Sequence, residues 1–222
     1  MIIIPQPANS PLSNAASSPG GAVAATPKGR ASLPSILLVA AWGVLMVVGF
    51  VGLERYSQAP GAPGTRVEHW PNNAGLARPG NGQATVVLSV HPLCPCTAAT
   101  LDELQQVLMR RDLPPFHLVV LRLLPSEKPA EWKDSALPDW LSSYPGVQVV
   151  EDRDAALSDT FGLTTSGHVA FYRPDGTLAF KGGITASRGH RGENLGAATL
   201  KALLHGQPPP AEATSVYGCS LK

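Results

Sequence analysis

The sequence predicts an α/β fold in which helices flank a mixed β-sheet. Three features predict it: short apolar runs typical of buried strands, leucine stripes at helical spacing between them, and a tight-turn signal late in the chain. Over residues 84–206 the predicted elements follow the order strand, helix, strand, helix, strand, strand, helix, or βαβαββα. Two strands joined by a crossover helix, then a hairpin and a final helix, indicate a mixed sheet.

The first half of this region supplies two buried strands and the helix that connects them. Ala84–Val90 and Phe116–Leu124 are apolar runs of the kind expected for strands covered on both faces. Between them, Thr97–Arg111 carries leucines at helical spacing and ends in two arginines, which favour the negative end of a helix. We therefore expect a parallel strand pair with a crossover helix.

The second half holds shorter elements. Three segments are predicted before the hairpin: a helix at 137–143, a short edge strand at 147–150 and a helix at 153–161. Pro174-Asp175-Gly176 is a tight-turn signal, so the runs on either side, 168–173 and 177–181, are expected to pair antiparallel. Asn194–Leu204 predicts a final amphipathic helix.

Composition excludes several classes of protein. The 222 residues allow one domain with appendages. Seventeen basic and sixteen acidic residues leave a net charge of +1, too little concentrated positive charge to predict nucleic-acid binding. Three cysteines are too few for a small fold held together by disulfides.

An apolar segment near the N-terminus predicts a membrane helix. Ser35–Leu53 contains 19 residues without a charge, and a helix of that length spans about 28 Å, close to the hydrocarbon thickness of a bilayer. We therefore expect a disordered tail over 1–34, a transmembrane helix over 35–53, a Pro/Gly-rich linker over 54–83 that tethers the domain, and a C-terminal tail over 207–222.

The orientation of this helix is not decided by its flanking charges. Lys28 and Arg30 precede the segment and Arg55 and Arg66 follow it, so the basic residues balance. Long C-terminal domains are translocated largely regardless of charge. We expect a single-pass protein with its N-terminus in the cytoplasm and its domain extracytoplasmic, in the periplasm.

Two cysteines lie where the first strand meets the first helix. Cys94 and Cys96 bracket Pro95 in the segment HPLCPCT. A sulfur in the first turn of a helix feels the positive end of the helix dipole and the unpaired N–H groups, which lowers its pKa. Buried structural cysteines are the alternative. The pattern favours redox or metal chemistry.

The third cysteine, Cys219, lies in the C-terminal tail. Val216 and Tyr217 could anchor this segment so that Cys219 reaches the other two thiols. Three pairings are then open: Cys94–Cys96, Cys94–Cys219 and Cys96–Cys219. A Cys-X-Cys disulfide closes a small, strained ring, and a pairing with Cys219 is geometrically easier.

Three blocks of the sequence resemble RedB-type, membrane-tethered relatives of thioredoxin, within the wider TlpA and ResA group. They are HPLCPCTAATLDEL, TSGHVAFYRPDGTLAFKGGITASRGHRG and YGCSL, and the resemblance covers about residues 66–221. It implies a thioredoxin-like fold, whose core has the element order given above. It also implies a thiol–disulfide role, with Cys94 and Cys96 in the active-site position. With the tail cysteine added, we expect an oxidoreductase that acts on a protein thiol or disulfide, needs no cofactor and has Cys94, Cys96 and Cys219 as catalytic residues.

The sequence departs from the thioredoxin pattern at two places. One residue rather than two separates Cys94 from Cys96, and Gly167 stands where thioredoxins carry a cis-proline. Further residues are expected to tune the thiols from nearby positions: His91, Pro95, Thr97, Gly167, His168, Arg188 and His190. Of these, His168 is expected to face the two cysteines and to stabilise a thiolate, or else to be hydrogen-bonded to backbone at a strand end.

Two other functions remain open. Cys94 and Cys96 with His91 or His168 would suit a soft ion such as Cu(I), so the domain could be a copper-binding or metallochaperone module. The fold could also serve as a non-catalytic interaction module. Trapping of mixed disulfides and Cu(I) titration distinguish the three hypotheses.

Overall fold

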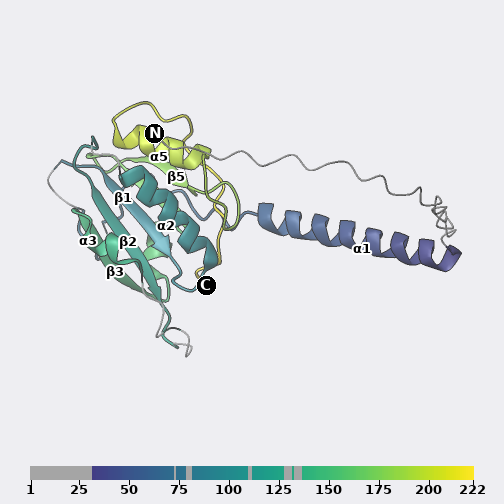
Figure 1. Ribbon diagram of the computed structural model, residues 1–222. Coiled ribbons are helices and arrows are strands. Elements are labelled where there is room, and N and C mark those ends of the chain that lie inside the picture. Colours follow the sequence, from purple (N-terminus) through teal and green to yellow (C-terminus); the bar gives the residue numbers. More distant parts are fainter. Residues whose placement is uncertain (1–31, 73, 79–81, 110–111, 128–131, 133–136) are drawn as a thin grey trace, which may run out of the picture. The chain divides into compact units, whose positions relative to one another are not determined.

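The computed structural model describes residues 32–222 except 73, 79–81, 110–111, 128–131 and 133–136. Figure 1 shows its elements, whose bounds are α1 Leu33–Gln58, β1 Thr85–Val90, α2 Pro95–Leu108, β2 His117–Leu124, α3 Asp139–Ser143, β3 Val147–Arg153, α4 Ala156–Thr160, β4 His168–Tyr172, β5 Leu178–Gly182 and α5 Leu195–Leu204. The mixed sheet expected from the sequence is present.

The sheet has five strands in the order β3-β2-β1-β4-β5. Strands β1, β2 and β3 are parallel, whereas β4 runs antiparallel to both β1 and β5. β3 is longer than the four-residue strand predicted, because it pairs with β2 from Leu118↔Val147 to Leu124↔Arg153. The sequence signal was weak because this edge strand is mostly exposed and lacks a continuous apolar run.

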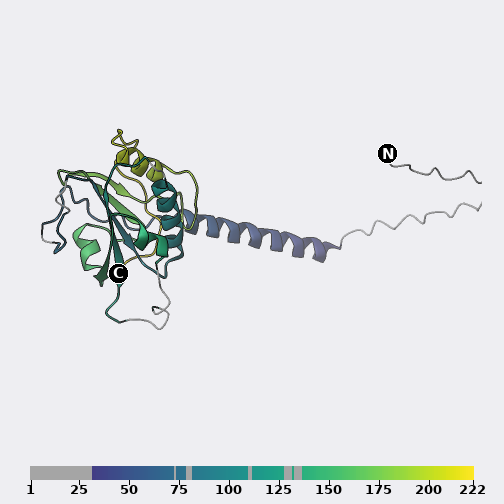
Figure 2. The same ribbon diagram turned by 60° about the vertical axis from the view of Figure 1, so that its left-hand side comes forward.

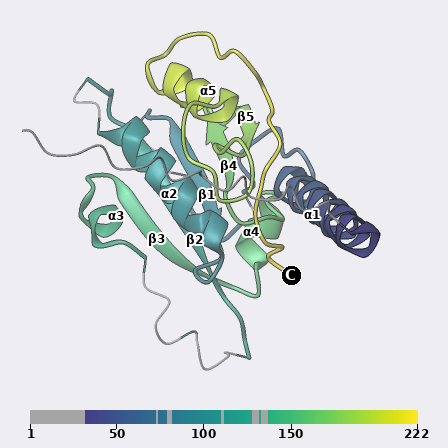
Figure 3. The same ribbon diagram turned by 45° about the vertical axis from the view of Figure 1, so that its right-hand side comes forward.

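Helices cover both faces of the sheet. One apolar cluster joins alternate residues of β1 (Val86, Leu88 and Val90) to α2 and α5. The intervening residue Val87 packs on the opposite face, in a second cluster that includes Phe161, which follows α4. Figure 3 shows α2 and α5 together on one side of the strands. The carboxyl end of β1 therefore leads directly into the start of α2.

Residues expected to form a tether instead pack against the domain. Trp70 is buried, and its N–H donates to the carbonyl of Gly176 at 2.8 Å. The N–H of Leu178 donates to Glu68 O at 2.8 Å, so this segment continues the sheet beyond β5. The prolines and glycines of this segment therefore lie in a chain that is packed on the domain, not in a free linker.

A buried lysine fixes the earlier part of the same segment. Lys181 of β5 donates from Nζ to the carbonyls of Pro63 and Thr65, both at 2.6 Å. Gly64 has φ +62°, and a Cβ there would lie 2.0 Å from Gly162 O. Glycine is required because a side chain cannot fit between these two backbones.

The C-terminal tail also belongs to the folded domain. Ala213 bridges to Lys181, and Thr214 Oγ1 donates to Gly183 O at 2.7 Å. The buried Val216 accepts a hydrogen bond from Gly61 N at 2.8 Å. The chain that follows α5 therefore runs back along β5 toward the carboxyl end of β1.

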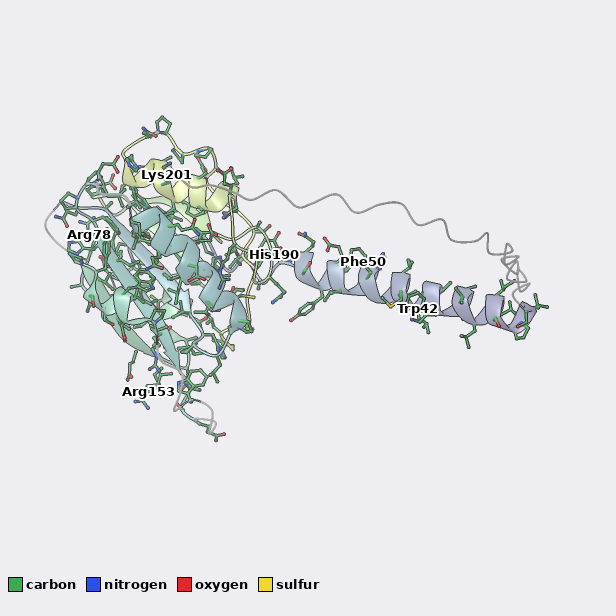
Figure 4. The ribbon with its side chains drawn as sticks, in the orientation of Figure 1. Trp42, Phe50, Arg78, Arg153, His190 and Lys201 are labelled. Atoms are coloured by element: carbon green, nitrogen blue, oxygen red, sulfur yellow. The ribbon has the colours of Figure 1, made fainter. Side chains whose placement is uncertain are left out.

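Helix α1 is longer than the segment predicted from hydropathy. It covers 26 residues, none of them buried (Figure 2). Trp42 and Phe50 project outward from it (Figure 4). Within the described ranges it is the one helix long and apolar enough to cross a membrane. The chain divides into two compact units at Met46, and the predicted tail over 1–34 lies outside the described residues except for its last three.

Candidate functional site

Cys94 occupies the N-cap position of α2. Its backbone is extended, with φ −82° and ψ 122°, and Pro95 follows at the first helical position, which suits the fixed φ of proline. The loop before it is closed by hydrogen bonds from Cys94 N and Thr97 Oγ1 to the carbonyl of His91, at 3.0 and 2.7 Å. Cys94 is 3 % exposed. The sequence positions this thiol at the junction of β1 and α2.

Cys219 lies directly beside Cys94. Its backbone N–H donates to Cys94 Sγ at 3.3 Å. Cys96, two residues further along α2, is also buried, and all three cysteines are free thiols. The structure thus brings the tail cysteine to the strand–helix junction.

Short β-like contacts hold the tail in place. Ser220 bridges antiparallel to Thr165, Ser166 N donates to Cys219 O at 2.9 Å, and Leu221 N donates to Thr164 O at 3.1 Å. The Leu221 side chain is buried in a cluster with four other apolar residues: Leu123, Leu124, Trp132 and Ala155. Apolar burial and backbone pairing together fix the position of the thiol.

The three thiols differ in acidity. Burial on its own would raise the pKa of Cys94, but the thiol and N–H of Cys219, together with the N–H groups of Cys96 and Thr97, outweigh it, so that pKa is lowered. Burial raises the pKa of Cys96, and the neighbouring Cys94 sulfur raises it further. The same two causes raise the pKa of Cys219 to about 12. Cys94 therefore loses its proton first.

Arg188 supplies positive charge next to the cluster. Its guanidinium lowers the pKa of both Cys96 and Cys219, against the larger effect of burial. Arg188 Nη1 donates to Gly218 O at 2.8 Å, one residue before Cys219. The guanidinium also lies 5.1 Å from the ring centre of Tyr56, and its buried Nε has no partner among the described residues. Arg188 therefore lies near the thiols.

Ser166 is a site residue that the sequence analysis missed. Its Oγ accepts a hydrogen bond from His91 N at 2.8 Å and lies 2.8 Å from Thr97 Oγ1. Ser166 is fully buried, and its own N–H binds the carbonyl of Cys219. It therefore joins the loop before α2 to the tail. Its position next to Gly167 was the available signal.

Gly167 is required by its backbone conformation. It has φ +88°, and a Cβ would lie 2.7 Å from Thr100 Oγ1 of α2. Its N–H donates to Ser89 O at 2.8 Å. Proline cannot replace it in this conformation, since proline has φ near −65° and no N–H. The expected departure from the thioredoxin pattern is thus built into the site.

His168 does not face the cysteines, and that prediction is wrong. A Cβ on Gly167 would point toward α2, and Val169 packs in the α2 layer, so alternation along β4 places the intervening side chain on the opposite face. Burial and the charge of Lys181 lower the pKa of His168 to about 3, so the ring is neutral. Its buried Nδ1 has no hydrogen-bond partner in the described part of the chain.

The structure separates the other two predicted histidines, His91 and His190. His91 Nδ1 accepts a hydrogen bond from Leu93 N at 3.2 Å, and its ring packs edge-on against Trp132. Burial lowers the pKa of His91. His190 is exposed on the loop that follows Arg188 (Figure 4). His91 organises the loop by its backbone and ring, whereas no side-chain contact among the described residues places His190 at the thiols.

The four residues suggested for copper are not gathered into one site. His168 lies on the face away from α2, and the Nδ1 of His91 is already engaged. Among the residues that the structure describes, no three His, Cys, Asp or Glu side chains form a group that could hold a metal ion.

Comparisons with known proteins bear on the fold. No family model matches the chain, and no curated protein does. A solved hypothetical protein from Sinorhizobium meliloti is 15% identical, over 75% of this chain and 97% of that chain, with a TM-score of 0.52. The sheet order and the helices on both faces agree with the thioredoxin-like fold expected from the sequence. The fold is thioredoxin-like.

Two further solved structures align less well with this chain. A secreted disulfide oxidoreductase from Mycobacterium tuberculosis is 22% identical, over 45% of this chain and 68% of that chain, with a TM-score of 0.32. The thioredoxin domain of a thiol-disulfide oxidoreductase from Bacteroides vulgatus is 14% identical, over 67% and 99%, with a TM-score of 0.36. In this thioredoxin-like domain the cysteines lie at the carboxyl end of β1, where open α/β sheets bind ligands.

Proposed function

We propose that this chain is a membrane-anchored, extracytoplasmic thiol–disulfide oxidoreductase of the RedB type that works through Cys94-Pro95-Cys96. The observation that carries the proposal is the place of Cys94 at the start of α2, with the N–H of Cys219 3.3 Å from its sulfur; these surroundings lower the pKa of the Cys94 thiol. A thiolate, not a thiol, attacks a disulfide. Cys94 is therefore the nucleophile.

The reaction proceeds by two exchanges at sulfur. The Cys94 thiolate attacks a disulfide of a partner protein: the new S–S bond forms to Cys94 Sγ, and the other partner sulfur leaves as a thiolate. A second thiol of this chain, once deprotonated, attacks Cys94 Sγ and releases the partner's second sulfur. Two electrons pass to the partner, whose thiolates take up the protons, and an internal disulfide remains. Run in reverse, the same steps oxidise a dithiol, and no cofactor is required.

The proposed anchor is α1. Its 26 residues exceed the number needed to span a bilayer, and only its last turns carry charge, at Glu54 and Arg55. A cytoplasmic N-terminus is proposed because the long C-terminal domain is the part expected to be translocated. Labelling of intact cells with a membrane-impermeant maleimide tests the side: the cysteines should react only if the domain is extracytoplasmic.

Trapping of a mixed disulfide tests the chemistry. The full-length chain in detergent micelles is reduced, mixed with glutathione disulfide, quenched with iodoacetamide and mapped by mass spectrometry. We expect glutathione on Cys94 first, and no such adduct in Cys94→Ser, whereas the matched control Cys96→Ser still forms it. The proposal fails if Cys94 is inert or if Cys94→Ser reacts as fast as the unaltered chain. Stoichiometric Cu(I) binding that needs both cysteines, with inert thiols, would favour the copper module.

A further inference from the structure

The C-terminal tail lies in the site as a docked peptide. Residues 219–221 run antiparallel to 164–166 and form two backbone hydrogen bonds and one bridge with them. An extended segment that adds to an exposed backbone edge is a common way for a protein to bind a peptide. Here the chain itself supplies the peptide, and the residue placed against Cys94 is a cysteine.

Three contacts at the residues next to Cys219 hold the tail in place. Arg188 Nη1 binds the carbonyl of Gly218, and the buried Leu221 packs in its apolar cluster on the other side. A Cβ on Gly218 would lie 2.0 Å from Ser166 O, so the two backbones touch and only glycine fits. Several independent contacts therefore fix Cys219 in front of Cys94.

Cys96 is placed less favourably as a partner for Cys94. It belongs to the first turn of α2, and the N–H of Gly189 and the guanidinium of Arg188 lie near its sulfur. A Cys94–Cys96 disulfide would also close a small ring across Pro95, whose φ is fixed. The N–H groups of Cys96 and Cys219 both act on the Cys94 sulfur, and that of Cys219 lies 3.3 Å from it. The difference between the two cysteines is therefore the ring: a Cys94–Cys219 disulfide is free of the small ring that Pro95 imposes on Cys94–Cys96.

Resting on the proposed function, we propose that Cys219 is the resolving cysteine and that the docked tail is the second redox arm of the enzyme. After Cys94 has formed a mixed disulfide, the Cys219 thiol gives up its proton and attacks Cys94 Sγ. The partner's sulfur leaves as a thiolate and takes up that proton, and a Cys94–Cys219 disulfide remains. Arg188 stabilises the attacking thiolate through its charge.

Single-cysteine replacements in the full-length chain test this assignment. The reduced protein in detergent micelles is mixed with glutathione disulfide and quenched at intervals, and its disulfides are mapped. We expect a Cys94–Cys219 disulfide in the unaltered chain and in Cys96→Ser. In Cys219→Ser the glutathione adduct on Cys94 should persist at least about tenfold longer, since its resolving thiol is gone. Cys219→Ala serves as a second variant with no hydroxyl.

The possible results separate the two proposals. A Cys94–Cys96 or Cys96–Cys219 disulfide in the unaltered chain, or stalling in Cys96→Ser rather than Cys219→Ser, overturns the assignment of Cys219 while leaving Cys94 as nucleophile. Absence of any adduct on Cys94 overturns the proposed function itself. In both cases the outcome is read from the mapped bond and not from activity toward an unknown partner.

A variant without a changed thiol tests the docking of the tail. Leu221→Ala removes the apolar anchor, so resolution of the adduct, measured from equal starting amounts of adduct, should slow about tenfold. Because the docked tail also lowers the pKa of Cys94, formation of the adduct should slow as well and is followed as a separate rate. The matched control is Leu195→Ala on α5, since Leu195 is 53% exposed and should change neither rate. Unchanged resolution in Leu221→Ala would show that the docked tail does not position Cys219.

Discussion

The backbone N–H of Cys219 donates a hydrogen bond to Cys94 Sγ although 125 positions separate the two residues in sequence. Because an N–H donor stabilises the thiolate over the thiol, the acidity of Cys94 depends on the tail. A change that moves the tail should therefore also change the pKa of Cys94.

Alkylation of the three thiols should follow the order of their acidity. Since the pKa of Cys94 is lowered and those of Cys96 and Cys219 are raised, iodoacetamide should modify Cys94 at the lowest pH. Peptide mass mapping of the full-length chain over a pH series gives one curve for each cysteine. Modification of all three only at strongly alkaline pH would contradict the proposed nucleophile.

Loss of Cys219 should make Cys94 less acidic. In Cys219→Ala the thiol donor is removed, burial of Cys94 is unchanged, and the pKa of Cys94 should rise. The measurement is the midpoint of Cys94 alkylation against pH, compared with Cys96→Ala. An equal or lower midpoint in Cys219→Ala would mean that the tail does not stabilise the thiolate.

Replacement of Arg188 should affect both acidity and tail docking. Arg188→Gln removes the charge that lowers the pKa of Cys96 and Cys219, so both should become less acidic. It also removes a hydrogen bond to Gly218 O, so hydrogen exchange of the tail amides should speed up. Arg188→Lys is the control that keeps the positive charge but lacks the planar guanidinium that binds Gly218 O. If Gln and Lys behave alike, geometry rather than charge is responsible.

Gly167→Ala should destabilise the domain. The added Cβ would combine a positive φ with an approach of 2.7 Å to Thr100 Oγ1, and we expect a loss of about 2–3 kcal/mol in the free energy of unfolding. Gly206→Ala has a similar φ of +67° with nothing within 4 Å, so it measures the backbone strain alone. Equal losses in the two variants would rule out the contact with Thr100 as a cause.

Ser166→Ala should weaken the loop before α2. The substitution leaves the N–H of His91 without its acceptor in a partly buried place and removes the hydrogen bond between Ser166 and Thr97, although the Thr97 hydroxyl keeps its bond to His91 O; we expect a cost of about 1–3 kcal/mol. Ser143→Ala is the exposed control, since within the described part of the chain Ser143 Oγ binds only the carbonyl of Asp139 on its own helix. Thermal melts of the two variants should differ clearly. If they do not, solvent or a neighbouring group satisfies His91 and Thr97.

Local sequence patterns predicted most of the fold. The apolar runs of β1 and β2 and the turn at Asp175-Gly176 identified the strands of the sheet, because burial on both faces and a tight turn leave strong compositional signals. The extent of β3 was underestimated, because the half-exposed residues of an edge strand leave only a weak compositional signal. The junction at Cys94 followed from the same local patterns.

Long-range packing decided what the sequence could not predict. A shift of one residue in the pairing of β4 with β1 would move the His168 side chain to the other face of the sheet. The sequence does not reveal which of the two registers is formed, because Gly167 has no side chain whose polarity could indicate the face. The role of Ser166 arises from contacts with His91 and with the tail, both distant in sequence. No local pattern reports such contacts, and the three possible pairings of the cysteines stayed open for the same reason.

The two hydrogen bonds from Lys181 to Pro63 and Thr65 bear on how a soluble fragment should be cut. A fragment starting at residue 84, where the composition changes, would leave that ammonium buried with no carbonyl to bind and would uncover the pocket of Trp70. A fragment starting at residue 59 keeps residues 59–83, which include the carbonyls that bind Lys181 and the buried Trp70. Residues 59–83 are part of the folded domain, and truncation within them should yield aggregated protein rather than a smaller folded domain.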